Sequence, residues 1–189
     1  MNPSNMLARL EPASTVLLVV DVQEKLAAAM PKDALDRLVK NTCILLEAAR
    51  LLGVRVVATE QYPKGLGKTL APIAEKLPGP PIEKLDFSAL DEPHVAHALN
   101  APSRPRAVVV TGMESHVCVF QSARDLATRG YATYVVEDAV ASRREENRLA
   151  GLELAQRAGA IRTVTETVAF DWIRRAEGDT FKAISKLVR

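Results

Sequence analysis

Three side chains with complementary chemistry stand where short apolar runs of the sequence end. Asp21 directly follows the run 15–20, Lys84 ends the short segment 81–84, and Cys118 lies shortly after the run 107–111. A thiol can act as a nucleophile, and a carboxylate can take its proton and later return it to a leaving group. An ammonium group can keep that carboxylate ionised and favour the thiolate. Together the three residue types predict nucleophilic catalysis, provided that the fold brings them together.

The position of Cys118 supports a catalytic role. The run 107–111 is rich in β-branched residues and is typical of a strand buried on both faces, and Gly112 ends it. Ser115 offers a helix N-cap, and Gly130 ends the helix that follows. A helix N-terminus stabilises negative charge, so we expect a lowered thiol pKa and backbone N–H groups able to bind an oxyanion. Cysteine alone is more often a packing residue, so the argument depends on all three side chains.

The elements that must position these residues alternate along the chain. Apolar runs predict strands at 15–20, 54–59, 81–84, 107–111, 131–137 and 160–164. Helical periodicity and stop signals predict helices at 33–52, 69–77, 91–99, 115–129, 145–158, 170–175 and 179–188.

This alternation predicts an α/β fold of the Rossmann-like kind. We expect a single three-layer α/β/α domain over residues 15–189, with a mostly parallel six-stranded sheet, preceded by a loose N-terminal arm over residues 1–14. Because the carboxyl ends of parallel strands meet at one edge of the sheet, Asp21, Lys84 and Cys118 are expected to converge there.

Composition narrows the classes of partner and compartment. The chain has 189 residues, 48% of them hydrophobic and 25% charged, with a net charge of +2. Such a balance favours neither nucleic acid nor a membrane surface as a partner. With only two cysteines, no apolar run long enough to span a membrane and no secretion signal, the chain is expected to be cytoplasmic.

Three motifs resemble those of the isochorismatase-like cysteine hydrolases. They are Val19-Val20-Asp21-Val22-Gln23, Lys84-Leu85-Asp86-Phe87-Ser88 and Gly112-Met113-Glu114-Ser115-His116-Val117-Cys118. Their order and spacing match the family over roughly residues 15 to 175. The segment 59–67 further resembles the subgroup named isochorismatase domain-containing proteins.

The resemblance implies specific roles. It implies an Asp21–Lys84–Cys118 triad, a cis peptide between Met113 and Glu114, and an oxyanion site made by the N–H groups of Glu114 and Cys118. True isochorismatases lack the cysteine, so its presence implies cleavage of an amide or carbamoyl-type C–N bond through a thioester, without a cofactor. The resemblance also implies a small-molecule substrate and a homo-oligomer.

The loop at 60–68 departs from one branch of that family. Nicotinamidases carry an Asp and two His in this loop as metal ligands, whereas this loop has no His and no Asp. We therefore expect no metal. Gln23, Tyr62 and Phe87 are candidates to line the substrate pocket, although packing is an equally open role for each.

Other interpretations carry less weight. Gly67-Lys68-Thr69 resembles the end of a phosphate-binding loop but lacks its first glycine. On a helix His116 would point away from Cys118, and His94 and His97 have no evident third metal ligand. No dinucleotide-binding glycine motif follows the first strand. A non-catalytic binding or scaffold protein that retains the hydrolase fold remains the alternative.

Overall fold

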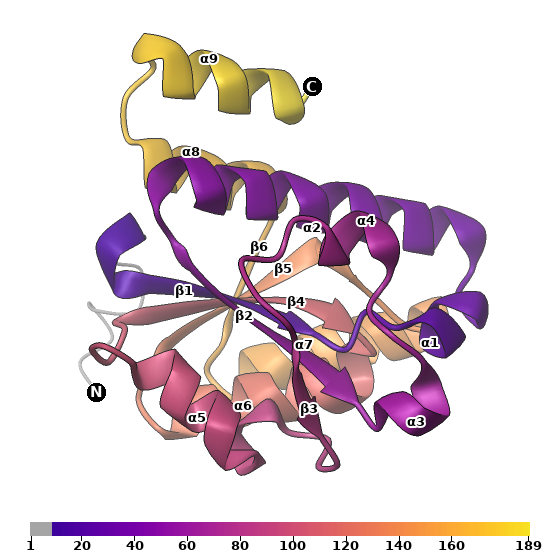
Figure 1. Ribbon diagram of the computed structural model, residues 1–189. Helices are drawn as coiled ribbons and strands as arrows, with labels where there is room; N and C mark the ends of the chain where they lie inside the picture. Colours follow the sequence, from indigo (N-terminus) through magenta and orange to yellow (C-terminus); the bar gives the residue numbers. More distant parts are fainter. Residues whose placement is uncertain (1–8) are drawn as a thin grey trace.

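A six-stranded parallel sheet in the order β3-β2-β1-β4-β5-β6 forms the centre of the molecule (Figure 1). The computed structural model describes residues 9–189. The strands are β1 (Thr15–Val20), β2 (Arg55–Gln61), β3 (Ile82–Lys84), β4 (Ala107–Met113), β5 (Ala132–Ala141) and β6 (Ile161–Thr163). The predicted α/β class is confirmed, and the sheet is wholly rather than mostly parallel.

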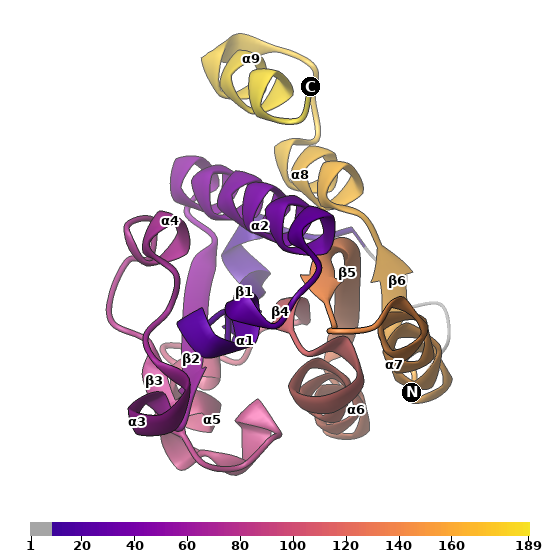
Figure 2. The ribbon, with the colours of Figure 1, turned by 90° about the vertical axis from the view of Figure 1, so that its right-hand side faces the viewer.

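Helices cover both faces of this sheet. Figure 2 shows α2, α8 and α9 on one side and α5, α6 and α7 on the other, whereas α1 and α3 lie at one end of the sheet. The bounds are α1 (Glu24–Ala28), α2 (Lys32–Leu52), α3 (Pro63–Leu66), α4 (Ala71–Ala74), α5 (Pro93–Asn100), α6 (Phe120–Thr128), α7 (Glu145–Arg157), α8 (Thr165–Ile173) and α9 (Gly178–Leu187). The three-layer architecture agrees with the sequence-based prediction.

Side chains of β1 alternate between two hydrophobic cores. Leu17 and Val19 pack in the cluster that contains Leu38 of α2, whereas Val16 and Leu18 pack in the cluster that contains Leu126 of α6. Successive residues of a strand point to opposite faces, so a strand covered on both sides must be apolar throughout. This requirement explains the uninterrupted apolar run that identified β1.

Gly112 lets β4 lie close to the end of β1. Its φ is +126°, and an added Cβ would lie 2.0 Å from the carbonyl oxygen of Val20. A side chain at position 112 would therefore force β1 and β4 apart next to Asp21, so this position requires glycine.

Several local predictions were wrong. Helix α3 lies within the predicted loop 60–68, and α8 begins at Thr165 rather than near residue 170; α1 lies in a segment for which the sequence analysis predicts no element. Strand β5 runs on to Ala141, past its predicted end at residue 137, because its register with β4 shifts between Val110 and Gly112. An irregularity of this kind realigns a strand without a signal in the hydrophobic pattern.

The segment before β1 is attached to the domain from residue 9 onward. Leu10 is buried, and its N–H donates to Asp171 of α8 over 2.8 Å. A loose arm is therefore the wrong description of residues 9–14, and the rest of that prediction lies outside the residues described. Within residues 9–189 no helix combines the length and apolar character needed to cross a bilayer.

Candidate active site

Asp21 and Lys84 form a fully enclosed ion pair at the carboxyl edge of the sheet. The Lys84 Nζ donates to Asp21 Oδ2 over 2.7 Å, and neither side chain is exposed. Asp21 Oδ1 accepts a hydrogen bond from Thr59 Oγ1, also at 2.7 Å. Their mutual attraction and the additional hydrogen bonds offset the cost of removing two charges from water.

Main-chain and amide oxygens complete the surroundings of the ammonium group. Lys84 Nζ also donates to Gln61 Oε1 at 2.8 Å and to the carbonyl oxygens of Asp86 and Phe87 at 3.0 and 3.2 Å. The register of the sheet creates this arrangement, since Gln61 is the direct partner of Lys84 across β2 and β3. Four oxygen atoms therefore hold the ammonium group in place, and Thr59 in turn holds the Asp21 carboxylate.

Cys118 joins this pair from the other side, beyond β4. It lies in a π-helical turn, Ser115–Val119, rather than in the first turn of an α-helix, and only 5% of it is exposed. Its thiol lies near enough to Asp21 for the carboxylate charge to raise the thiol pKa. The three predicted catalytic residues therefore lie together, with Asp21 between the ammonium and the thiol.

The expected lowering of the Cys118 pKa is wrong. Burial and the negative charge of Asp21 raise the pKa of the Cys118 thiol to about 12, and the opposing influence of Lys84 is too small to reverse this. The resting site thus holds a protonated thiol beside a carboxylate that can remove its proton. Asp21 is therefore placed to act as the base for the Cys118 thiol, and the resting site does not hold a preformed thiolate.

The turn before Cys118 has the backbone that the family resemblance implied. The peptide between Met113 and Glu114 is cis. The Glu114 side chain is buried and pairs with Arg143, whose guanidinium lies 3.1 Å from the Glu114 carboxylate. The oxyanion role of the Glu114 and Cys118 N–H groups stays a prediction.

The three predicted pocket residues occupy different surroundings. Gln23 is fully buried, and its amide bonds to the backbone of Gln61 and Gly67, which ties the loop after β2 to the end of β1. Tyr62 and Phe87 are half exposed, at 51% and 54%. Gln23 therefore holds the loop after β2, whereas the two aromatic side chains are partly exposed to solvent. Contact with substrate stays a prediction for all three.

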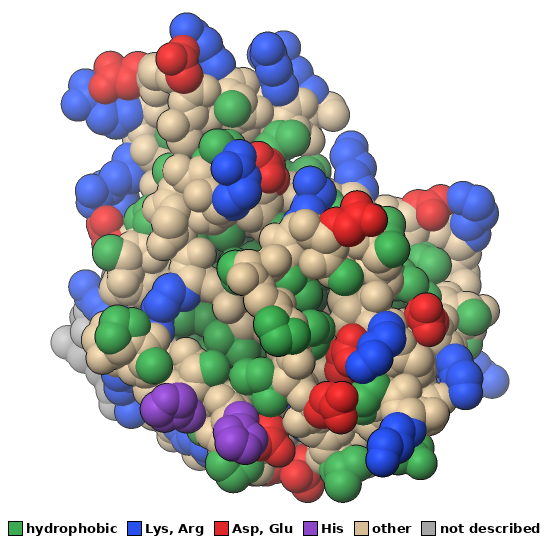
Figure 3. Space-filling view, viewed as in Figure 1, with side chains coloured by type: hydrophobic (Ala, Val, Ile, Leu, Met, Phe, Trp, Pro, Cys, Tyr) green, Lys and Arg blue, Asp and Glu red, His purple; other side chains and the backbone are tan. Residues whose placement is uncertain are grey.

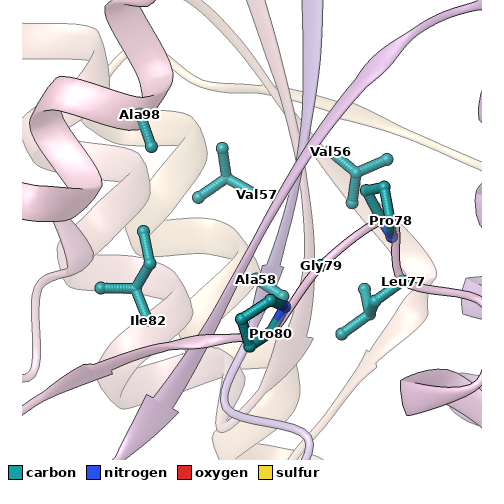
Figure 4. A pocket seen from close by; sticks show the side chains of 9 residues that line it. All are labelled: Val56, Val57, Ala58, Leu77, Pro78, Gly79, Pro80, Ile82 and Ala98. Carbon is teal, nitrogen blue, oxygen red and sulfur yellow. The ribbon is translucent and has the colours of Figure 1, made fainter.

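Two hollows lie along the β2–β3 side of the molecule. One, of about 430 Å³, lies between α3 and the segment after β3 and includes Tyr62, Lys84 and Asp86 in its lining. The other, of about 260 Å³, is apolar and lies between β2 and the turn that contains Pro78 and Pro80 (Figure 4). Of these two hollows, only the larger is lined by one of the three predicted catalytic residues, Lys84. Figure 3 shows acidic and basic side chains intermixed on this face, without a single-sign patch.

Sequence reasoning missed Thr59 and Gln61. Both contact the ion pair directly, Thr59 through Asp21 and Gln61 through Lys84. Their spacing of two residues on a strand was an available signal, because it places both side chains on the same face of β2. The serine at 142 was missed as well, because the strand was expected to end before it.

The histidines do not add to the catalytic centre. Nδ1 of His116 lies 3.1 Å from the Ser142 hydroxyl, which agrees with the expectation that it does not pair directly with Cys118. His94 and His97 lie on α5. Across residues 9–189, no group of three or more His, Cys, Asp or Glu side chains is arranged to hold a metal ion.

Comparison with known proteins places this fold and site in a family. The model of the isochorismatase domain matches residues 15–167. The chain therefore belongs to the isochorismatase-like hydrolase family.

Individual relatives share nearly the full length of the chain. The secreted isochorismatase effector Isc1 of Phytophthora sojae is 39% identical over 97% of this chain and 88% of its own length. Isochorismatase domain-containing protein 2 of Danio rerio is 36% identical, over 96% of this chain and 90% of its own. The subgroup indicated by the segment 59–67 is thus represented among the relatives. Since one relative is described as secreted, a cytoplasmic location for this chain stays a prediction.

Solved structures show the same fold. A structure described as MAR1 ribonuclease from Caenorhabditis elegans has a TM-score of 0.88 and 34% identity, covering 96% of this chain and 92% of that one. YcaC from Escherichia coli, described as an octameric hydrolase of unknown specificity, has a TM-score of 0.86 at 22% identity, covering 95% and 89%. The latter likeness supports the fold alone.

Proposed function

We propose that this protein is a cofactor-independent hydrolase that cleaves an amide or carbamoyl-type C–N bond of a small molecule. The observation that carries the proposal is the enclosed Asp21–Lys84 ion pair beside the buried Cys118 thiol, whose pKa the Asp21 charge raises. These residues supply a nucleophile, a neighbouring base and a group that orients the base, which is the arrangement that covalent catalysis requires.

The first half of the proposed reaction forms a thioester. Asp21 takes the thiol proton as the Cys118 sulfur attacks the carbonyl carbon, and the N–H groups of Glu114 and Cys118 hold the resulting oxyanion. Asp21 then gives the proton to the nitrogen, so that the C–N bond breaks and ammonia or an amine leaves. Lys84 holds the Asp21 carboxyl group in place while that group gains and loses the proton.

The second half releases the acid. Asp21 takes a proton from a water molecule, whose oxygen attacks the thioester carbonyl. The C–S bond breaks, the carboxylic acid departs, and the proton on Asp21 returns to the Cys118 sulfur. The cycle consumes one water and needs no metal or redox cofactor in its balance.

A screen of small amides tests this proposal. Ammonia release would be measured for the wild type and for Cys118→Ser and Asp21→Asn, and the acyl-enzyme would be sought by intact-protein mass spectrometry after rapid acid quench. We expect release that both substitutions abolish, with a mass increase confined to Cys118. RNA belongs in the screen because one relative is described as a ribonuclease; Cys118-dependent RNA cleavage would contradict C–N specificity.

A non-catalytic binding protein would give a different result with the same small amides. A binding protein would gain thermal stability from a small amide without consuming it, and Cys118→Ser would leave that gain intact.

The assembly state is a separate proposal: we expect a homo-oligomer, and light scattering coupled to size-exclusion chromatography measures it.

A further inference from the structure

The buried hydroxyl of Ser142 ties the end of β5 to the turn that carries the nucleophile. Ser142 Oγ accepts a hydrogen bond from the backbone N–H of Ser115 at 3.1 Å, and it lies 3.1 Å from His116 Nδ1. In return, Ser115 Oγ donates to the carbonyl of Ala141 at 3.2 Å. The end of β5 therefore contacts two consecutive residues of the turn.

These bonds determine the orientation of one particular peptide unit. The Ser115 N–H belongs to the same peptide plane as the Glu114 carbonyl, and that carbonyl accepts from the N–H groups of Val117 and Val119 at 3.0 and 3.2 Å. The plane is thus held from both of its polar ends. Rotation of this peptide would change the whole π-helical turn, because the carbonyl anchors two of its N–H groups.

Helix α7 packs against the backbone of the same π-helical turn. An added Cβ at Gly151 would lie 2.5 Å from the Ser115 carbonyl carbon and oxygen and 2.6 Å from the His116 nitrogen. These are backbone atoms that cannot turn aside as a flexible side chain would. The absence of a side chain at Gly151 therefore lets the helix contact the turn backbone directly.

A third contact fixes the acidic side chain at the start of the turn. The Arg143 backbone N–H donates to Glu114 Oε2 at 3.0 Å, and the Arg143 guanidinium pairs with the same carboxylate. Ser142 and Arg143 are neighbours, so one short segment after β5 holds both the side chain of Glu114 and the peptide that follows it.

We propose that Ser142 and Gly151 are positioning residues that hold the turn from Glu114 to Cys118 in the geometry needed to bind an oxyanion. This inference rests on the proposed thioester chemistry, because it concerns the backbone donors of that reaction. The Glu114 N–H directly precedes the clamped peptide and the Cys118 N–H follows it within the same turn. Donors of this kind act only when they are fixed before the charge develops.

Two reactions of the same thiol separate oxyanion binding from thiol reactivity. With p-nitrophenyl acetate, the Cys118 sulfur forms a bond to the carbonyl carbon, a tetrahedral oxyanion appears, and p-nitrophenolate leaves. With iodoacetamide, the sulfur displaces iodide directly and no oxyanion forms. In both reactions the thiol proton passes to Asp21. The ratio of the two rates at Cys118, measured by peptide mass spectrometry, therefore reports on the oxyanion site.

The decisive variant is Ser142→Ala, with Ser122→Ala as its matched control. Ser122 is also a buried serine whose hydroxyl accepts a backbone N–H, but its partner is Ala89 and not a residue of the turn. We expect Ser142→Ala to lower acylation by about 10- to 100-fold, which is less than the roughly 100- to 1,000-fold cost of losing an oxyanion donor, because the donors are loosened and not removed. Alkylation, which forms no oxyanion, should change by no more than about twofold. Ser122→Ala should leave the ratio of the two rates unchanged.

Hydrogen exchange provides the second measurement. We expect faster amide exchange over residues 114–119 in Ser142→Ala and not in Ser122→Ala. An unchanged rate ratio, or an equal loss of both reactions, would overturn the positioning role, and so would unchanged exchange in the turn. A wild-type Cys118 that is alkylated but never acylated would instead contradict the proposed function, and the exchange result would still decide whether Ser142 holds the turn.

Discussion

Lys84 Nζ lies 2.7 Å from Asp21 Oδ2 in a site where neither side chain is exposed. Lys84→Met would leave the carboxylate buried without its counter-charge, and we expect a loss of about 3–5 kcal/mol in the free energy of unfolding. The double variant Asp21→Asn/Lys84→Met should lose less than the sum of the two single variants, because it leaves no uncompensated charge. Urea denaturation measures all four proteins.

The matched control for this prediction is Lys182→Met. Lys182 pairs with Asp179 over 3.3 Å on the surface of α9, where water already solvates both groups. It should change stability little. A Lys84→Met variant as mild as Lys182→Met would show that the buried pair does not stabilise the fold.

The two cysteines should differ in their reaction with iodoacetamide. Cys118 is almost fully buried with a pKa of about 12, whereas Cys43 is only partly buried. At pH 7.5 we therefore expect Cys43 to be alkylated faster, since the thiolate is the reacting form and must be reached by the reagent. Peptide-resolved mass spectrometry gives both rates from one sample. Faster labelling of Cys118 would mean that the protein reorganises to expose a thiolate.

The same pKa predicts a loss of stability in alkaline solution. The fold raises the Cys118 pKa above its ordinary value of 9.0, so between pH 9 and about 12 the folded chain retains a proton that the unfolded chain has released. Stability should therefore fall as the pH rises through this window, by up to about 1.4 kcal/mol per pH unit from this group. Other groups titrate there too, so the measured quantity is the difference between the wild type and Cys118→Ala. Parallel stability curves for the two proteins above pH 9 would contradict this prediction.

Gly151→Ala should destabilise the protein through backbone overlap. The added methyl group would lie 2.5 Å from the Ser115 backbone, so α7 or the turn must move, and overpacking of this kind costs about 1–3 kcal/mol. Gly79→Ala is the control, because nothing lies within 4 Å of its added Cβ. Thermal unfolding of both variants makes the comparison; equal midpoints would show that α7 yields without cost.

Gln23→Leu should loosen the loop after β2. The substitution keeps the approximate volume but leaves the Gln61 N–H and two carbonyl groups without the bonds that Gln23 supplies. An unsatisfied buried polar group costs about 1–3 kcal/mol. We expect faster hydrogen exchange over residues 61–67 than in the wild type, and unchanged exchange there would rule out this tethering role.

The convergence of Asp21 and Lys84 was predictable because the signals are local. Asp21 follows a predicted strand and Lys84 ends one, and a parallel sheet brings such strand ends to one edge. The pKa of Cys118 was not predictable in this way, since it depends on burial and on the distance to Asp21, which only the folded chain creates. The role of Ser142 was hidden for a related reason: the register shift in β5 carries the strand past the polar residues that normally mark an end.

The carbonyl groups of Asp86 and Phe87 hold the Lys84 ammonium through the main chain alone. Exchange of the side chains at these two positions leaves those oxygen atoms in place. Phe87 nevertheless presents its ring to the solvent beside the site. Under the proposed function, the side chains of this segment can therefore change by single substitutions, and with them the contacts offered to a substrate, while the main-chain oxygens that hold the ammonium stay in place.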